Sequence, residues 1–321
     1  MGVTFVTIRL SLRIKRSREE ADLTKSTSGK SFHTIGLVGR AGNPMVTDSV
    51  LAVERFLSTT ESELVLEAVT GSMLSGHNYE TMERAALGER CDLVVVVGGD
   101  GSILGVARDL AESQVPIVGV NRGGLGFLAD VAPDQIEQKI GAVLAGQYTI
   151  DERFLLEARI VRDDEFVEGS SALNDGVVHA GTMSRMMDFS LYVDRDLVYE
   201  QRSDGLIVAS PTGSTAYSLS AGGPIMHPSL DAIVVVPMFP HTLTSRPLVV
   251  RGDADIKVVI AKTAEMPKFS CDSQVDHALR GGDEVHIAKH PHSLNLLYPL
   301  GHSFFESCRS KLDWASRLGD G

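Results

Sequence analysis

The feature that most limits the fold of this chain is a change of pattern near residue 150. Before it, from about residue 33 to 131, short apolar stretches alternate with amphipathic ones. They cover 34–38, 46–57, 63–69, 79–87, 93–97, 103–110 and 116–120, and a further helix is expected over 134–144. Alternating strands and helices of this kind form a parallel sheet covered by helices, so the first part predicts an α/β domain.

After residue 150 the pattern becomes that of strands alone. The expected strands are 154–161, 165–167, 176–179, 188–193, 197–201, 206–209, 232–236, 255–260, 268–271, 284–288 and 293–298. Many short strands separated by Gly, Asp and Pro predict an antiparallel β-sandwich. A last amphipathic segment, 303–318, predicts a C-terminal helix that packs back on the first domain.

With 321 residues, the chain is longer than one hydrophobic core usually supports. We expect an α/β domain over 33–132, completed by 303–321, and a β-rich domain over 133–302. Residues 1–32 contain a basic cluster and a Ser/Thr/Lys/Gly stretch, and we expect them to form a disordered tail. A transit segment and an upstream start are the alternatives, and the acidic pair at 19–20 weighs against the former.

Composition excludes several classes of function. The net charge of −12 opposes a nucleic-acid partner, which requires a basic face. No apolar run approaches the roughly 18 residues of a membrane span, so no membrane partner is expected. Cys91, Cys271 and Cys308 are odd in number and widely separated, which argues against zinc or disulfides and for a reduced, cytoplasmic protein.

The strongest local signal is the run 94–102, in which four valines lead into Gly-Gly-Asp-Gly-Ser. Gly98, Gly99 and Gly101 let backbone amides approach phosphate oxygens, and the following helix adds its positive N-terminal end. Asp100 then lies at the carboxyl end of a parallel strand, where α/β sheets bind ligands. The alternative is an ordinary strand-to-helix turn with a capping Asp. Neither the Walker loop nor the dinucleotide fingerprint is present.

Two further segments are candidates for the same site. The glycine-rich run 123–127 follows the next strand and reaches the same edge of the sheet, unless it is only a chain reversal into the second domain. The segment 202–224 is rich in hydroxyl groups and glycine, and it contains Tyr217. It offers hydrogen bonds and a stacking face to a nucleotide, and a structural loop is the alternative.

From about Thr34 to the C-terminus, these motifs resemble those of the bacterial NAD kinases. The resemblance rests on 98–101, 121–128, 172–175, 203–228, 237–243 and 246–248. Gly-Gly-Asp-Gly alone is shared with diacylglycerol kinases and phosphofructokinases, and the other motifs separate the families. The resemblance implies a kinase that phosphorylates the 2′-hydroxyl of the adenosine ribose of NAD to give NADP. It also implies ATP or polyphosphate as donor, Mg²⁺ or another divalent metal, and a homotetramer or dimer with NAD commonly bound across subunits.

The resemblance also assigns roles to residues. Asp100 is expected to engage the reacting hydroxyl, Gly101 and Phe127 to line that site, and Asn174 and Asp175 to contact NAD. Five further positions are expected to contact the dinucleotide: Asp204, Thr215, Ala216, Tyr217 and Ser220. Gly98, Gly99, Gly101 and Ser102 form the expected phosphate-donor loop, and no metal ligand is assigned. Arg185 bears on the choice between NAD and NADH, or is simply a solvated loop charge.

Three positions depart from the commonest family pattern. Asp175 stands where many members have Glu, Ser102 where many have Thr, and Asp272-Ser273-Gln274 where Asp-Gly-Gln is usual. Each change is chemically mild. Two rival functions remain: a related kinase acting on a lipid, and a catalytically silent protein that binds NAD or NADP. The intact Asp100 weighs against the silent protein.

Overall fold

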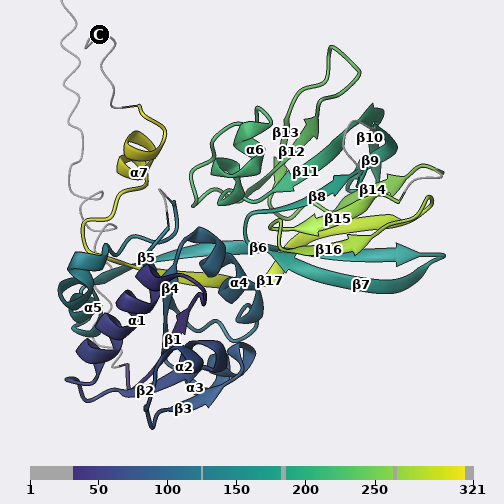
Figure 1. Cartoon of the computed structure of the whole chain (residues 1–321). Helices are drawn as coiled ribbons and strands as arrows, with labels where there is room; N and C mark the ends of the chain where they lie inside the picture. Colours follow the sequence, from purple (N-terminus) through teal and green to yellow (C-terminus); the bar gives the residue numbers. More distant parts are fainter. Residues whose placement is uncertain (1–31, 124–125, 182–185, 263–265, 315–321) are drawn as a thin grey trace, which may run out of the picture.

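The computed structural model describes residues 32–123, 126–181, 186–262 and 266–314, which form two domains (Figure 1). Within these residues, no helix is long and apolar enough to cross a membrane. The expected tail, apart from Phe32, lies outside the described residues. Phe32 itself is buried and its ring lies 5.9 Å from that of Tyr148, so the packed structure begins before residue 33.

The first domain contains a parallel sheet with the strand order β3-β2-β1-β4-β5. The strands are β1 (Thr34–Gly39), β2 (Glu63–Glu67), β3 (Glu80–Met82), β4 (Leu93–Gly98) and β5 (Ile117–Asn121). The helices are α1 (Pro44–Leu57), α2 (Ala68–Met73), α3 (Leu87–Arg90), α4 (Asp100–Asp109) and α5 (Ile136–Leu144). Every residue of β4 is buried, as an apolar run covered on both faces must be. α1 and α5 pack on one face, and α3 and α4 on the other.

The second domain is the predicted β-sandwich. One layer is the sheet β13-β12-β11-β8-β15-β16, and the other contains β10-β9-β14-β17 with β6 and β7. The strands are β6 (Tyr148–Arg162), β7 (Glu165–Ala172), β8 (Asp175–His179), β9 (Met187–Val193), β10 (Asp196–Ser203), β11 (Gly205–Ala209), β12 (Ala232–Met238), β13 (Leu248–Arg251), β14 (Ile256–Ile260), β15 (Lys268–Cys271), β16 (Val275–Ala278) and β17 (Glu284–Pro299). Phe189, Leu206 and Phe269 belong to the apolar cluster between the layers.

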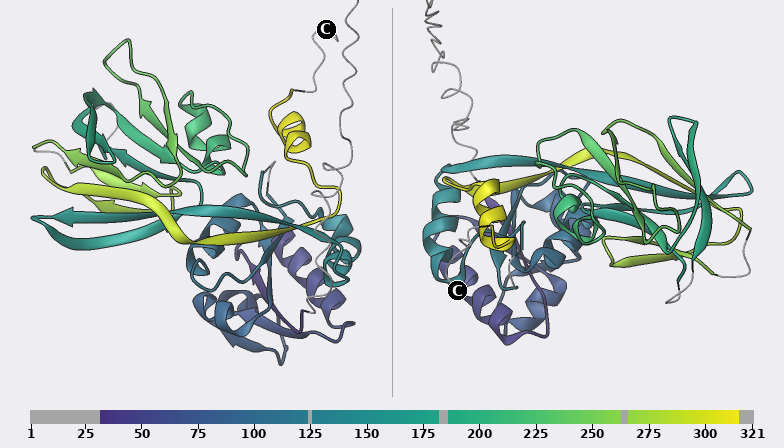
Figure 2. Two further views of the ribbon diagram at one scale, coloured as in Figure 1. Left: turned by 180° about the vertical axis from the view of Figure 1, so that it is seen from behind. Right: turned by 90° about the horizontal axis from the view of Figure 1, so that it is seen from above.

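Two long strands, β6 and β17, run side by side from one domain into the other (Figure 2). Their antiparallel pairing extends from Tyr148↔Pro299 to Val161↔Glu284, and β17 also pairs with β5 at Leu296↔Ile117. The two strands expected at 284–288 and 293–298 are therefore one. The two domains therefore share a hydrogen-bonded pair of strands. These backbone hydrogen bonds, and not only a flexible linker, fix how the domains are placed.

Two segments of the first domain differ from expectation. The helix expected over 79–87 is absent: β3 pairs in parallel with β2, and a short 3₁₀ turn at Arg84–Ala86 and α3 follow. Sheet pairing here overrides the local pattern. Ile136 and Ile140 of α5 lie in the apolar cluster under α1, so these residues pack with the first domain although they follow residue 132.

The C-terminal helix α7 (Phe304–Lys311) begins at Ser303, whose hydroxyl accepts the Glu306 N–H. The ring of Phe304 lies 6.5 Å from that of Phe127 in the first domain and 5.1 Å from that of His227 in the second. The helix packs on the first domain as predicted, and it also contacts the second. The expected helix residues after 314 lie outside the described part of the chain.

Candidate active site

Two glycine-rich loops meet at the carboxyl end of the parallel sheet. One follows β4 and contains Gly98 and Gly99, and the other follows β5 and contains Gly123. A Cβ on Gly123 would lie 3.0 Å from Gly99 Cα, and the Arg122 N–H donates to the Gly98 carbonyl at 2.8 Å. The two backbones are in direct contact, so a side chain at Gly123 would push the loops apart.

Asp100, the first residue of α4, holds the second loop through its carboxylate. Its Oδ2 accepts the Phe127 N–H at 2.5 Å, and its Oδ1 accepts the N–H groups of Leu128 and Ala129 at 3.0 and 3.3 Å. A Cβ on Gly126 would overlap the carboxylate. The N-cap position belongs to Gly99 and no side chain caps the helix, so Asp100 is not a conventional helix cap.

The hydrogen bonds of Asp100 leave it one acceptor position. A carboxylate has about four lone-pair positions, two on each oxygen. Within the described residues, Oδ1 accepts two N–H groups and Oδ2 accepts one. Oδ2 can therefore accept one further hydrogen bond, and Asp100 is only half-buried. The arrangement provides a fixed carboxylate oxygen for a ligand hydroxyl.

A turn from the second domain reaches α4. The Gln274 side-chain amide donates to the Gly101 carbonyl at 2.7 Å, and Arg108 donates to Gln274 Oε1 at 2.9 Å. In the same turn, Asp272 accepts three backbone N–H groups, from Leu173, Asn174 and Asp175, at 3.0, 2.8 and 3.2 Å. The turn thus connects Gly101 beside Asp100 with Asn174 and Asp175 at the start of β8. The sequence analysis noted residues 272–274 only as a departure from the family pattern. It assigned neither Asp272 nor Gln274 to the site.

Asp175 is almost completely buried beside Asp272. Burial, together with repulsion from the Asp272 carboxylate, raises the pKa of Asp175 to about 7. Burial also raises the pKa of Asp272, against the three N–H groups and Arg108, which lower it. Asp175 therefore carries a proton for part of the time at neutral pH, and it can donate as well as accept a hydrogen bond.

The hydroxyl-rich segment divides into a structural part and an open part. Ser210 donates to the Leu173 carbonyl at 2.5 Å, and Ser214 to the Pro211 carbonyl at 2.6 Å, so these buried hydroxyls hold the segment together. Gly213 packs directly on the Asn174 backbone. Tyr217 is 42% exposed. The predicted contacts Thr215, Ala216, Tyr217 and Ser220 are each at least partly exposed. The segment is therefore held against Asn174 at Gly213, and these four residues remain accessible to a ligand.

Within one chain, Asp204 does not lie beside Asn174 and Asp175. It precedes β11, in which Gly205 pairs with His179 and Ala209 pairs with Asp175. Four residues along a strand separate the two ends by about 13 Å.

Arg185, the proposed selectivity residue, lies outside the described residues, as do residues 124 and 125 of the second loop. Within the described residues, no three His, Cys, Asp or Glu side chains form a metal cage.

Fold and site together define a two-domain nucleotide-binding protein whose central group is a carboxylate between two glycine loops. Comparison with known proteins agrees. The ATP-NAD kinase N-terminal domain model matches residues 35–148, and the ATP-NAD kinase C-terminal domain model matches residues 173–298. The chain belongs to the NAD kinase family.

Individual relatives support this assignment. The chain is 50% identical to an NAD kinase of Pseudomonas putida over 291 residues, which cover 90% of this chain and 98% of the relative. It is 52% identical to an NAD kinase of Ectopseudomonas mendocina over 291 residues, covering 90% and 99%.

Two solved structures are similar in fold. Yeast NADH kinase complexed with NADH superposes with a TM-score of 0.83 at 22% identity, covering 91% of this chain and 90% of that one. An NAD kinase from Archaeoglobus fulgidus in complex with ATP has a TM-score of 0.68 at 26% identity, covering 87% and 98%.

The backbone of the 272–274 turn bears on one departure from the family pattern, the serine at position 273. Ser273 has φ +54°, a left-handed conformation that glycine adopts without strain. We expect Ser273→Gly to raise the unfolding free energy by on the order of 0.5–1 kcal/mol, the relief of strain being partly offset by the greater freedom of glycine in the unfolded chain. Chemical denaturation measures this, and a loss of stability in the variant would contradict it.

Asp175 predicts a pH dependence of stability. Its pKa is raised on folding, so its protonated form stabilises the folded state at low pH, and this contribution is lost as pH rises through about 7. Between pH 8 and pH 6 we expect wild type to gain on the order of 1 kcal/mol relative to Asp175→Asn. Denaturation of both proteins at both pH values measures it, and titrating groups that do not interact with Asp175 cancel in the difference. An unchanged difference would disprove the raised pKa.

Proposed function

We propose that this chain phosphorylates the 2′-hydroxyl of the adenosine ribose of NAD, with ATP as donor, and that Asp100 accepts the hydroxyl proton. The observation that carries the proposal is the remaining acceptor position on Asp100 Oδ2, between two glycine loops at the ligand edge of the sheet. The family and the ATP complex of the Archaeoglobus fulgidus relative support the choice of substrates.

The proposed reaction is a direct transfer. The ribose 2′-oxygen attacks the γ-phosphorus of ATP, a new P–O bond forms, and the bond from the γ-phosphorus to the β,γ-bridging oxygen breaks. The electron pair of the broken bond leaves with ADP, and the hydroxyl proton passes to Asp100. Such a reaction needs alignment and charge neutralisation more than covalent catalysis. The three N–H groups that fix the Asp100 carboxylate supply alignment.

The glycine loop is suited to the donor phosphates. Gly98 and Gly99 precede α4, a helix of 10 residues, and its first N–H groups face the ligand edge. Gly101 is exposed within the first turn. Ser102 lies against Gly98, and its hydroxyl is buried without a partner within the described residues, so it has one hydrogen bond left to give.

We also propose that a divalent metal, Mg²⁺ in particular, arrives with the donor phosphates. Mg²⁺ is commonly held by phosphate oxygens and water with one or two carboxylates, so it needs no protein cage. The half-buried Asp100 adds negative charge beside the glycine loops, and its open position on Oδ2 is kept for the ribose hydroxyl. When bound, the metal supplies positive charge to the phosphates.

NAD is proposed to lie along the second domain beside the Asp272 turn. Asn174 and Asp175 contact its ribose hydroxyls, and a protonated Asp175 can donate to one of them. Tyr217 offers an exposed ring for stacking. The 272–274 turn joins these groups to Gly101, so binding of NAD and alignment at Asp100 are connected through named hydrogen bonds.

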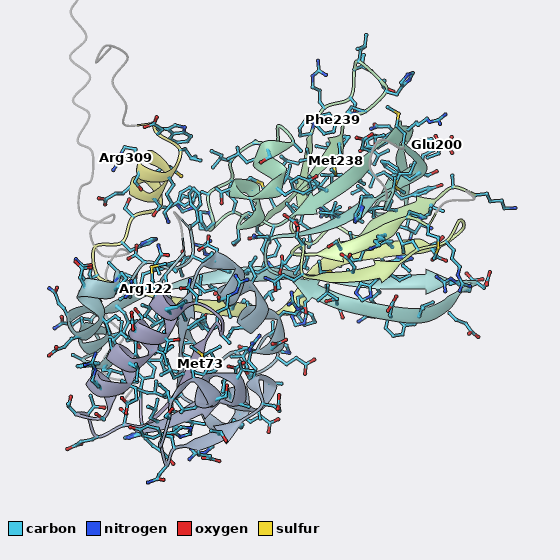
Figure 3. The ribbon with its side chains drawn as sticks, viewed as in Figure 1. Met73, Arg122, Glu200, Met238, Phe239 and Arg309 are labelled. Carbon is cyan, nitrogen blue, oxygen red and sulfur yellow. The ribbon has the colours of Figure 1, made fainter. Side chains whose placement is uncertain are left out.

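We further propose a homo-oligomer in which a second copy covers the far end of β11. Asp204 lies there, and its N–H donates to the Met238 carbonyl. Phe239 is 75% exposed and Leu243 is 94% exposed, and Figure 3 shows Phe239 at the end of β12 remote from the first domain. Exposed apolar groups of this size commonly mark an interface. Asp204 would then complete the NAD site of the neighbouring copy.

The oligomer proposal predicts the effect of a charge at this end. Phe239→Asp should reduce the mass measured by sedimentation equilibrium and also weaken the use of NAD, because a buried unpaired carboxylate opposes association. Met45→Asp, at an exposed apolar position on α1, is the matched control and should change neither. A monomeric wild type, or an unchanged mass for Phe239→Asp, would disprove the proposal.

The proposed activity is tested by incubating the purified chain with NAD, ATP and Mg²⁺ and assaying the product with an NADP-specific dehydrogenase. We expect NADP in proportion to enzyme, and none without donor. Replacing ATP with polyphosphate reports donor choice, and replacing NAD with NADH reports acceptor choice. Phosphorylation of diacylglycerol without NADP formation would favour the lipid kinase, and binding of NAD without any product would favour the silent protein.

A further inference from the structure

The C-terminal helix α7 lies over the second glycine loop and places a lysine beside it. Lys311 Nζ is 4.9 Å from the centre of the Phe127 ring. The Phe127 backbone N–H donates to Asp100 Oδ2. Phe127 therefore contacts both Lys311, through its ring, and the proposed catalytic carboxylate, through its backbone. Nothing in the sequence motifs assigned a role to this helix beyond packing.

Lys311 is half-buried and lies near carboxylates with which, among the described residues, it forms no direct ion pair. Within the described residues its ammonium group forms no ion pair and no hydrogen bond. Burial lowers the pKa of Lys311, while the negative charges of Asp100 and Asp130 act in the opposite direction. An ammonium group that is partly desolvated and has no direct hydrogen-bond partner among the described residues can take an anionic ligand as its partner.

A polar pocket of about 400 Å³ lies beneath α7. Its lining includes Asn121 at the end of β5, Ala129, whose N–H donates to Asp100, and Lys139 of α5, with Lys311 from α7. Small-molecule sites are commonly 300–1,000 Å³ in volume, so the pocket has room for several phosphate groups.

The lining of this pocket carries charges of both signs. Asp130 is paired with His302, with 3.3 Å between carboxylate oxygen and Nδ1, and the His302 ring stacks on Tyr298. Glu306 is exposed at the start of α7. Lys139 is half-buried and, within the part of the chain that the structure describes, has no ion pair. Two ammonium groups thus face the pocket, one from α5 and one from α7, and the Asp130 carboxylate acts on both.

We propose that the pocket beneath α7 binds phosphate groups of the donor, with Lys311 and Lys139 as its cationic ligands. This rests on the proposed function, because the donor is a triphosphate and the pocket adjoins the loop that holds Asp100. Lys311 then neutralises charge on the donor from the side opposite NAD. The helix that connects both domains through Phe127 and His227 thus contributes a binding residue as well as a contact.

The test measures binding of tripolyphosphate, without metal, to the full chain by isothermal titration calorimetry. Lys311→Met keeps the apolar stem on Phe127 but removes the charge, and we expect about 10-fold weaker binding, as is typical for loss of a charged hydrogen bond. Lys139→Met should act similarly, and Lys311→Arg should retain most of the affinity. Arg309→Gln removes an equal charge from an exposed position of the same helix (Figure 3) and is the matched control.

Kinetics supply a second readout. Lys311→Met should raise the KM for ATP about 10-fold and leave the KM for NAD unchanged, with a melting temperature near that of wild type. Wild-type affinity for tripolyphosphate in Lys311→Met, or an equal loss in Arg309→Gln, would overturn the assignment. If wild type forms no NADP but binds tripolyphosphate in a Lys311-dependent way, the proposed function fails and the site stands. If NADP forms and Lys311→Met behaves as wild type, the proposed function stands and the phosphate site beneath α7 fails.

Discussion

The interaction on which the site depends is the set of three hydrogen bonds from the 127–129 backbone to the Asp100 carboxylate. It fixes the second glycine loop against the first, orients the carboxylate and, counting the hydrogen bonds of the described residues, leaves a single acceptor position on Oδ2. Glycine is favoured at two positions of the second loop, because a side chain at Gly126 would overlap Asp100 and one at Gly123 would press against the Gly99 backbone. A buried N–H without a partner costs about 1–3 kcal/mol, so the loop and the carboxylate stabilise one another.

The second constraint is the connection between domains. The strands β6 and β17 carry sheet hydrogen bonds from the first domain into the sandwich, and the 272–274 turn reaches back to Gly101. The proposed acceptor-binding residues Asn174 and Asp175 are held to the same turn by Asp272. Proposed NAD contacts and the glycine loop are thus joined by continuous backbone and short polar contacts, as alignment of two substrates requires.

Much of the fold follows from local patterns. The buried run at β4 and the change of period after residue 150 predicted both domain types. The patterns failed where strand pairing outweighed them. Residues 79–87 have the pattern of a helix but supply β3. Two strands were expected on either side of residues 290–292, but β17 continues through them. Local periodicity carries no information on which strand lies beside which.

The site was predicted in part. The glycine-rich motif identified Asp100, yet its partners Phe127, Leu128 and Ala129 act through backbone N–H groups, which any residue has. Gln274 and Lys311 lie 174 and 211 positions after Asp100 in the sequence, and only folding brings them near. Asp204 was predicted for the same site, but the β8–β11 register places it at the other end of the sheet.

The most direct test of this account is the turnover of Asp100→Asn beside its melting curve and its affinity for NAD. Asn has one carboxamide oxygen for three N–H groups, so a modest loss of stability is expected. Because the proton acceptor is lost, kcat should fall by about 10²- to 10⁴-fold while the folded variant still binds NAD. A folded variant with kcat within threefold of wild type would contradict the central role of the Asp100 carboxylate.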